Sequence, residues 1–143
     1  MAKYDHLIVS DLKYEPEMSL DFKAIYERFA SRVLWIDSNV VPGAFQMNVS
    51  WYKKVPELDP IFEAHAHEDS EILGFFGTDP EDPYNLHGAV QVDIAGEPHT
   101  ITGSSLIFLP SNIPHALHIR RVDQPIFHFS IMSGAKYNNS AYK

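Results

Sequence analysis

Apolar and polar residues alternate along much of this chain, and the alternation predicts β-strands. Between residues 44 and 54 the apolar side chains are Phe45, Met47, Val49 and Trp51, with polar residues such as Asn48 between them. A period of two places successive side chains on opposite faces of a strand. Similar short runs, bounded by Gly, Pro, Asp or Asn, continue to residue 132. Seven to nine strands are expected, drawn from residues 32–37, 44–54, 62–67, 71–77, 89–94, 99–102, 105–109, 116–121 and 126–132.

A single segment has the spacing of a helix. Phe22, Ile25 and Phe29 are three and four residues apart, which places them on one helical face. Ser19 is suited to begin this helix, which is expected to end near residue 30 or 31. The first 18 residues are expected to form a packed arm, with the apolar run at 7–9 as a candidate edge strand.

Many short strands and one helix predict an all-β sandwich or barrel. The length of 143 residues suits one domain. We therefore expect an arm and helix at 1–31 packed on a β-barrel domain at 32–143, whose last residues, 135–143, wrap the surface. Residues 78–87 contain two Asp-Pro steps and are expected to be an insertion in a hairpin, either a lid over a site or a surface elaboration.

Composition excludes several classes of protein. The chain has no cysteine, which excludes disulfides, thiolate nucleophiles and cysteine-ligated metal centres. Its net charge of −8 would repel a nucleic acid backbone. No run reaches the ~18 apolar residues of a membrane span, and no secretory signal is visible, so we expect no membrane partner and a cytoplasmic location. Eight histidines are the feature that most needs an explanation.

Three histidines and a glutamate form a candidate metal site. His65 and His67 are two residues apart, so on a strand both point to the same face. Glu71 follows across a turn, and its strand can run back beside the first; His115 comes after a proline-marked turn. Three neutral imidazoles and a carboxylate suit a divalent transition metal with coordination positions left open. The His-x-His pair by itself is also explained by solvated or core histidines.

The ordered set of motifs resembles the cupin family. The first cupin motif, G-x5-H-x-H-x3,4-E-x6-G, aligns with Asp59, His65, His67, Glu71 and Thr78. The second, G-x5-P-x-G-x2-H-x3-N, aligns with Ser104, Pro110, Asn112, His115 and Ile119. Asp59, Thr78, Ser104 and Asn112 stand where the motifs have glycine. Asparagine, as at position 112, tolerates the left-handed backbone conformation that glycine adopts. The resemblance implies a double-stranded β-helix (jelly-roll) barrel and Fe, Mn, Ni or Zn bound by His65, His67, Glu71 and His115.

A metal site of this kind predicts a metal-dependent enzyme acting on a small oxygenated organic substrate. The reaction is that of a dioxygenase or of a non-redox decarboxylase, lyase or isomerase. The alternative is a non-catalytic cupin that binds a metal and a small ligand, as a sensor or binding module. The residues expected to contact a substrate or ligand are Tyr52, Phe75 and His128, and no catalytic acid or base can be named.

Other polar residues fit the site less well. His118 is expected to face away from it and to be solvated, and His128 lies either inward or on an outer sheet face. At most one of Arg120 and Arg121 can point to a substrate carboxylate, since neighbours on a strand point to opposite faces. Glu63 is expected at the rim.

Apolar side chains are in excess on the faces away from the expected metal. If the polar residues at 46, 48 and 50 look into the barrel, then Phe45, Met47, Val49 and Trp51 look outward, as do Ile72 and Phe76. A patch of that size is unusual on a soluble monomer. We therefore expect a two-fold homodimer, with the arm and helix as a competing cover.

Overall fold

The computed structural model describes residues 2–134, so the expected surface segment at 135–143 lies outside the described residues. The helices are η1 (Asp5–Leu7, a 3-10 turn) and α1 (Leu20–Phe29). The strands are β1 (Ala30–Ile36), β2 (Gln46–Tyr52), β3 (Phe62–His65), β4 (Glu71–Phe76), β5 (Asn85–Ile94), β6 (Glu97–Gly103), β7 (Ser105–Leu109), β8 (His115–Val122) and β9 (Ile126–Met132). Within the described range, no helix has the length and apolar character to cross a membrane.

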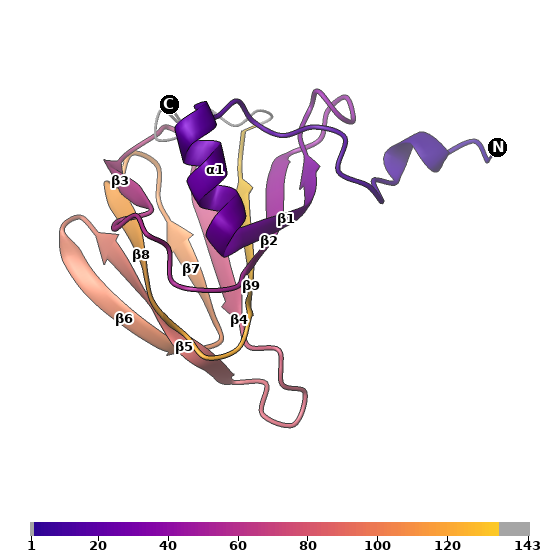
Figure 1. The fold of residues 1–143 in the computed structure, drawn as a ribbon. Coiled ribbons are helices and arrows are strands. Elements are labelled where there is room, and N and C mark those ends of the chain that lie inside the picture. Colours follow the sequence, from indigo (N-terminus) through magenta and orange to yellow (C-terminus); the bar gives the residue numbers. More distant parts are fainter. Residues whose placement is uncertain (1, 135–143) are drawn as a thin grey trace.

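Two antiparallel sheets face each other around one core. The first has the strand order β1-β2-β9-β4-β7 and the second the order β3-β8-β5-β6. Figure 1 shows them on opposite sides of the barrel. Large side chains such as Phe75, Leu86 and Ile126 are fully buried between the sheets. The all-β fold expected from the alternation, and the jelly roll implied by the resemblance to the cupin family, are confirmed.

The helix forms where its pattern predicts. The Ser19 hydroxyl accepts a hydrogen bond of 3.1 Å from the backbone nitrogen of Phe22, which satisfies one free donor at the helix start. Phe22, Tyr26 and Phe29 are buried against the barrel, and Ile25 is only half-buried. The Tyr26 hydroxyl lies 2.8 Å from that of Ser50, so α1 contributes to the inner surface of the barrel.

The first half of the N-terminal arm differs from expectation. No strand forms at 7–9; residues 5–7 make a 3-10 turn instead. Figure 1 shows this part of the arm extending away from the barrel, and Leu7 and Ile8 are exposed. Only Val9 of the apolar run is partly covered, so the run buries too little surface to offset the cost of ordering a strand.

The connection between β4 and β5 is shorter than expected. Strand β5 begins at Asn85, so residues 85–87 belong to the sheet rather than to an insertion. Gly77 makes this close approach possible, because a Cβ at that position would clash with the carbonyl oxygen of Asn85. The connection follows the last residue of β4, whereas Glu71 is the first. It therefore lies at the opposite end of the strand from Glu71.

The two faces of β2 divide as predicted. Gln46, Asn48, Ser50 and Tyr52 are buried inside the barrel. Phe45 points outward and is 67% exposed. Other exposed side chains on the same outer face are Ile72, Leu106 and Phe108, and we call these four residues the outer apolar patch.

The outer apolar patch leads to a prediction about assembly. We expect the protein to be a homodimer through this patch and the neighbouring outer face of β2, where the half-buried Trp51 lies. Phe108→Glu in the patch, or Trp51→Glu beside it, should shift the protein to monomer, because a buried carboxylate without a partner is costly. Light scattering at micromolar concentration should give about twice the chain mass of 16.3 kDa for the unchanged protein. Tyr84→Glu, which alters an exposed aromatic outside the patch, is the control. A monomeric mass for the unchanged protein would contradict the prediction.

Candidate metal centre

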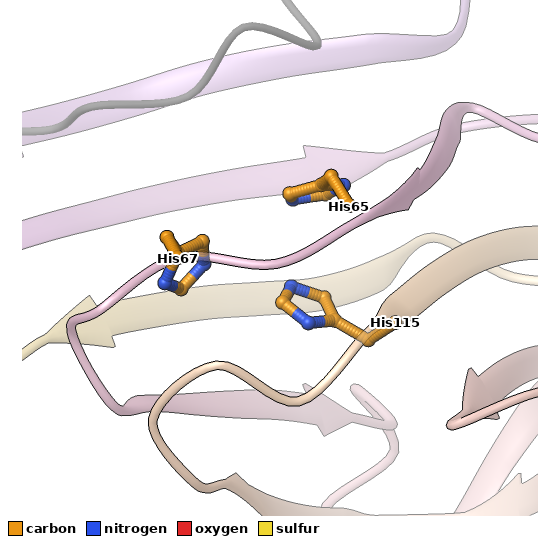
Figure 2. A group of neighbouring side chains, drawn as sticks. All are labelled: His65, His67 and His115. Carbon is orange, nitrogen blue, oxygen red and sulfur yellow. The ribbon is translucent and has the colours of Figure 1, made fainter.

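The three predicted histidines come together at one end of the barrel. His65 is the last residue of β3 and lies opposite His115, the first residue of β8, in the antiparallel pair. One nitrogen from each of His65, His67 and His115 lies within 4.8 Å of the others. Figure 2 shows the three rings gathered from these two segments. One detail differs: β3 ends at His65, so His67 reaches the cluster from the following loop.

Hydrogen bonds fix which nitrogen of each ring carries the proton. Each Nδ1 lies within hydrogen-bond distance of a backbone carbonyl, which can only accept. The pairs are His65 with Glu63 (2.8 Å), His67 with Asp69 (2.7 Å) and His115 with Ile113 (2.9 Å). Each Nδ1 therefore donates, and each Nε2 is the nitrogen whose lone pair can bind a metal. Metal-binding imidazoles are oriented in this way.

One buried nitrogen supports a metal at this place. Nε2 of His115 is buried and has no hydrogen-bond partner among the described residues. A buried polar atom without a partner costs free energy. A divalent cation would satisfy this nitrogen together with those of His65 and His67, so the donor set fits a metal.

Glu71 approaches the cluster from across the barrel. Its Oε1 atom lies 3.5 Å from Nε2 of His115 and 3.9 Å from Nε2 of His67. The expectation that β4 would run beside β3 was wrong: β4 pairs with β7 and β9, and β3 pairs with β8. The carboxylate thus meets the histidines across the space between the two sheets.

Burial and charge act differently on two of the histidines. Burial lowers the pKa of His65 below its ordinary value, and the neighbouring His115 and His67 act in the same direction. Burial also lowers the pKa of His115, but the carboxylate of Glu71 and the Ile113 carbonyl outweigh it, so the pKa is raised. Positive charge is therefore favoured beside Glu71, which also suits a cation.

A small cavity adjoins the cluster. His65, Glu71 and His115 form part of its wall, and the other lining residues are Tyr26, Asn48, Tyr52, Phe62, Leu73, Ala116, Leu117, His128 and Ser130. The cavity volume that is open to the centres of water molecules is about 40 Å³. One buried water needs ~10–15 Å³ of such volume. The cavity therefore has room for a ligand of only a few non-hydrogen atoms.

The three predicted contact residues occupy different places. Tyr52 and His128 line the cavity. Phe75 is fully buried beside it and stacks on His128, with ring centroids 4.7 Å apart. Tyr52 stacks on His128 at 4.9 Å. His128 thus faces inward, which decides between the two orientations left open by the sequence.

His128 is held as a neutral ring. Its Nδ1 lies 2.9 Å from the carbonyl of Gly74, to which it donates. Burial lowers its pKa to about 4, the Gly74 carbonyl opposes this shift, and the charge of Arg32 adds to it. At neutral pH the side chain therefore carries no charge.

Other candidate residues lie outside the cavity. His118 is not solvated as expected: its ring nitrogens lie 2.6 Å from a carboxylate oxygen of Asp59 and 2.8 Å from one of Asp93. The hydrogen bond with His118 lowers the pKa of Asp59 below its usual value. Arg120 and Arg121 pair with Asp59 and Asp123 respectively, and Glu63 is exposed.

Among the residues of the cavity wall that sequence reasoning missed are two that carry hydroxyl groups, Ser130 and Tyr26. Ser130 lies directly opposite Asn48 in the β2–β9 pair and shares the inward parity of His128, so that parity could have identified it. Tyr26 was missed because an aromatic residue on the buried face of a helix is normally predicted to belong to the hydrophobic core. Its hydroxyl contact with Ser50 cannot be predicted from the sequence.

Comparisons with known proteins support the fold. No protein-family model and no curated protein matches the chain. An oxalate oxidase in complex with the substrate analogue glycolate is 15% identical over 94% of this chain and 63% of its own, with a TM-score of 0.57. An RmlC-like cupin from Shewanella frigidimarina is 17% identical over 64% of this chain and 68% of its own, with a TM-score of 0.43.

These findings establish the fold. The chain has the cupin fold, with a cluster of three histidines, His65, His67 and His115, that could hold a metal ion. It spans less than two thirds of that oxalate oxidase chain and 40% of a DMSP lyase chain with which it also aligns.

Proposed function

We propose that this protein is a metal-dependent enzyme acting on a small oxygenated organic molecule. The observation that carries the proposal is the cavity that His65, Glu71 and His115 line together with residues of the barrel interior. A metal held by the three histidines and Glu71, with iron or manganese as the working ion, would face this cavity with coordination positions left for a ligand.

The metal would supply Lewis-acid or redox chemistry at the open positions. Residues of the chain form the wall of the cavity and orient the metal ligands. Leu73 and Leu117 form an apolar part of the cavity wall, and Asn48 and Ser130 offer polar groups to a ligand on the side of the first sheet. The backbone carbonyls behind the three imidazoles hold the rings in the orientation for binding.

Cavity size narrows the substrate class. Space for a few water molecules suits compounds of the size of short hydroxy acids, keto acids or dicarboxylates. The structurally similar oxalate oxidase was crystallised with glycolate, a molecule in this range. We therefore propose a two- to four-carbon oxygenated acid as substrate, with a dioxygenase, decarboxylase, lyase or isomerase reaction.

The test begins with protein purified without added metal. Its metal content is measured, and the protein is then loaded with iron, manganese, nickel or zinc in turn. Oxygen consumption and product formation, followed by NMR, are measured against short hydroxy acids, keto acids, catechols, thiols and sugars. We expect turnover of at least one short acid with one loaded metal and none with His67→Ala. Metal-loaded protein that binds these compounds but converts none would instead identify a non-catalytic binding module.

A further inference from the structure

A buried arginine lies directly behind the cavity wall. Arg32 is on β1, and its side chain is only 2% exposed. Its guanidinium carbon lies 5.0 Å from the ring centre of Tyr26 and 5.2 Å from that of Trp35, within the range of cation–π contacts. Buried arginines are rare unless their charge and donors have defined partners.

A β-bulge directs this side chain inward. Arg32 pairs with Ser50, but Leu34 pairs with Val49, so one extra residue is inserted between them. Without the bulge, Arg32 and Trp35 would lie on opposite faces of β1, because they are three positions apart and side chains alternate between the faces. The bulge allows both to face the interior.

Arg32 determines how the amide of Asn48 is oriented. Nε of Arg32 donates a hydrogen bond of 2.7 Å to Oδ1 of Asn48, and the Ser50 hydroxyl donates to the same oxygen at 3.3 Å. Because arginine can only donate, the amide oxygen must face it. The Nδ2 group is therefore turned away from Arg32. Among the described residues, both of these hydrogen bonds of the Asn48 side chain end on Oδ1, and Asn48 lines the cavity.

Arg32 carries a positive charge beside the cavity wall and forms an ion pair with the N-terminal arm. Its ion-pair partner, Glu15 of the N-terminal arm, lies 3.1 Å from Nη1 and is itself partly exposed to water. The charge of Arg32 also contributes to the low pKa of His128, another residue of the cavity wall. The charge of Arg32 therefore acts on at least one side chain of the cavity wall.

We propose that Arg32 positions Asn48 so that its Nδ2 group donates hydrogen bonds into the cavity, and that this pair selects ligands presenting a carboxylate. The proposal rests on the proposed function, since the ligand is taken to lie in the cavity beside the metal. It deepens that function by assigning the recognition of the acid group to the first sheet. Arg32 acts through Asn48 and is a positioning residue.

The experiment compares acetate with acetamide, its neutral isostere, on zinc-loaded full-length protein. Zinc content is measured first, so failure to bind metal counts against the proposed function rather than against this inference. We expect acetate to bind at least about tenfold more tightly than acetamide, because hydrogen bonds to charged groups are the stronger ones. The side-chain amide signal of Asn48 in a 15N NMR spectrum should shift with acetate and not with acetamide.

Two variants separate selection from folding. Asn48→Asp keeps the pairing with Arg32 but replaces the donor by an oxygen, and should remove the preference for acetate while zinc stays bound. Arg32→Lys keeps the charge but loses the oriented Nε–H donor, and should reduce the preference at unchanged zinc content. Asn85→Asp, at an exposed position on β5, is the matched control. Equal affinities for the two probes, an unmoved Asn48 signal, or a preference retained in folded Asn48→Asp protein would overturn the inference.

Discussion

Replacing His67 by alanine is expected to remove the bound divalent metal from protein dialysed against a chelator. His67 contributes one of three imidazole nitrogens that lie within 4.8 Å of one another. Loss of even an outer partner of a metal ligand typically costs 10–100-fold in affinity, so loss of a ligand should cost at least about 100-fold. Metal content per chain, measured by mass spectrometry of the dialysed protein, checks this.

Two further variants make the metal experiment specific. His99→Ala removes an exposed histidine on β6 that pairs only with Glu97 among the described residues, and should leave the metal content unchanged. Glu71→Gln keeps the size of the side chain and removes its charge, and should weaken binding if Glu71 is the fourth ligand. Metal content in His67→Ala equal to that of the unchanged protein would show that the histidine cluster is not the site.

Local alternation was sufficient to predict the strands. Each of the nine expected segments overlaps an observed strand, and the span of β7, residues 105–109, was predicted without error. The inward positions of β2 and β4 followed from parity, because one face of each strand is buried against the same core. Asn112, aligned with a motif glycine, has a φ of 63°, the left-handed conformation expected for that position.

Sheet membership could not be read from the sequence. Strands β3 and β4 are neighbours in the chain, yet they belong to different sheets. A local pattern does not specify which distant strand supplies the hydrogen bonds, because pairing depends on contacts far apart in sequence. Glu71 nevertheless lies close to His67 and His115, since it faces the same interior from the other side.

Irregularities account for the remaining differences. A parity argument assumes an unbroken strand, and the bulge in β1 breaks it, which is why Arg32 was not recognised as an inward residue. His118 does face away from the cavity, as parity predicts, but its two carboxylate partners come from distant segments and could not be anticipated.

The second large effect that we expect is a loss of stability in mild acid caused by His128. The side chain is buried between Tyr52 and Phe75, beside the charge of Arg32, and its pKa is about 4. In the unfolded chain its pKa is the ordinary 6.5. As the pH falls below 6.5, His128 binds a proton in the unfolded chain but stays neutral in the folded protein. The free energy of unfolding therefore decreases until the pH reaches about 4.

Urea unfolding at pH 7 and pH 5, with chelator present, measures this contribution. From these two pKa values, His128 should lower the free energy of unfolding by about 2 kcal/mol between the two pH values. His128→Gln cannot take up the proton, so its loss of stability over the same interval should be smaller by that amount, while all other titrating groups contribute equally to both proteins. His6→Gln, which alters an exposed histidine of η1, should behave like the unchanged protein. If His128→Gln and the unchanged protein lost the same free energy between pH 7 and pH 5, His128 would not be a buried neutral histidine.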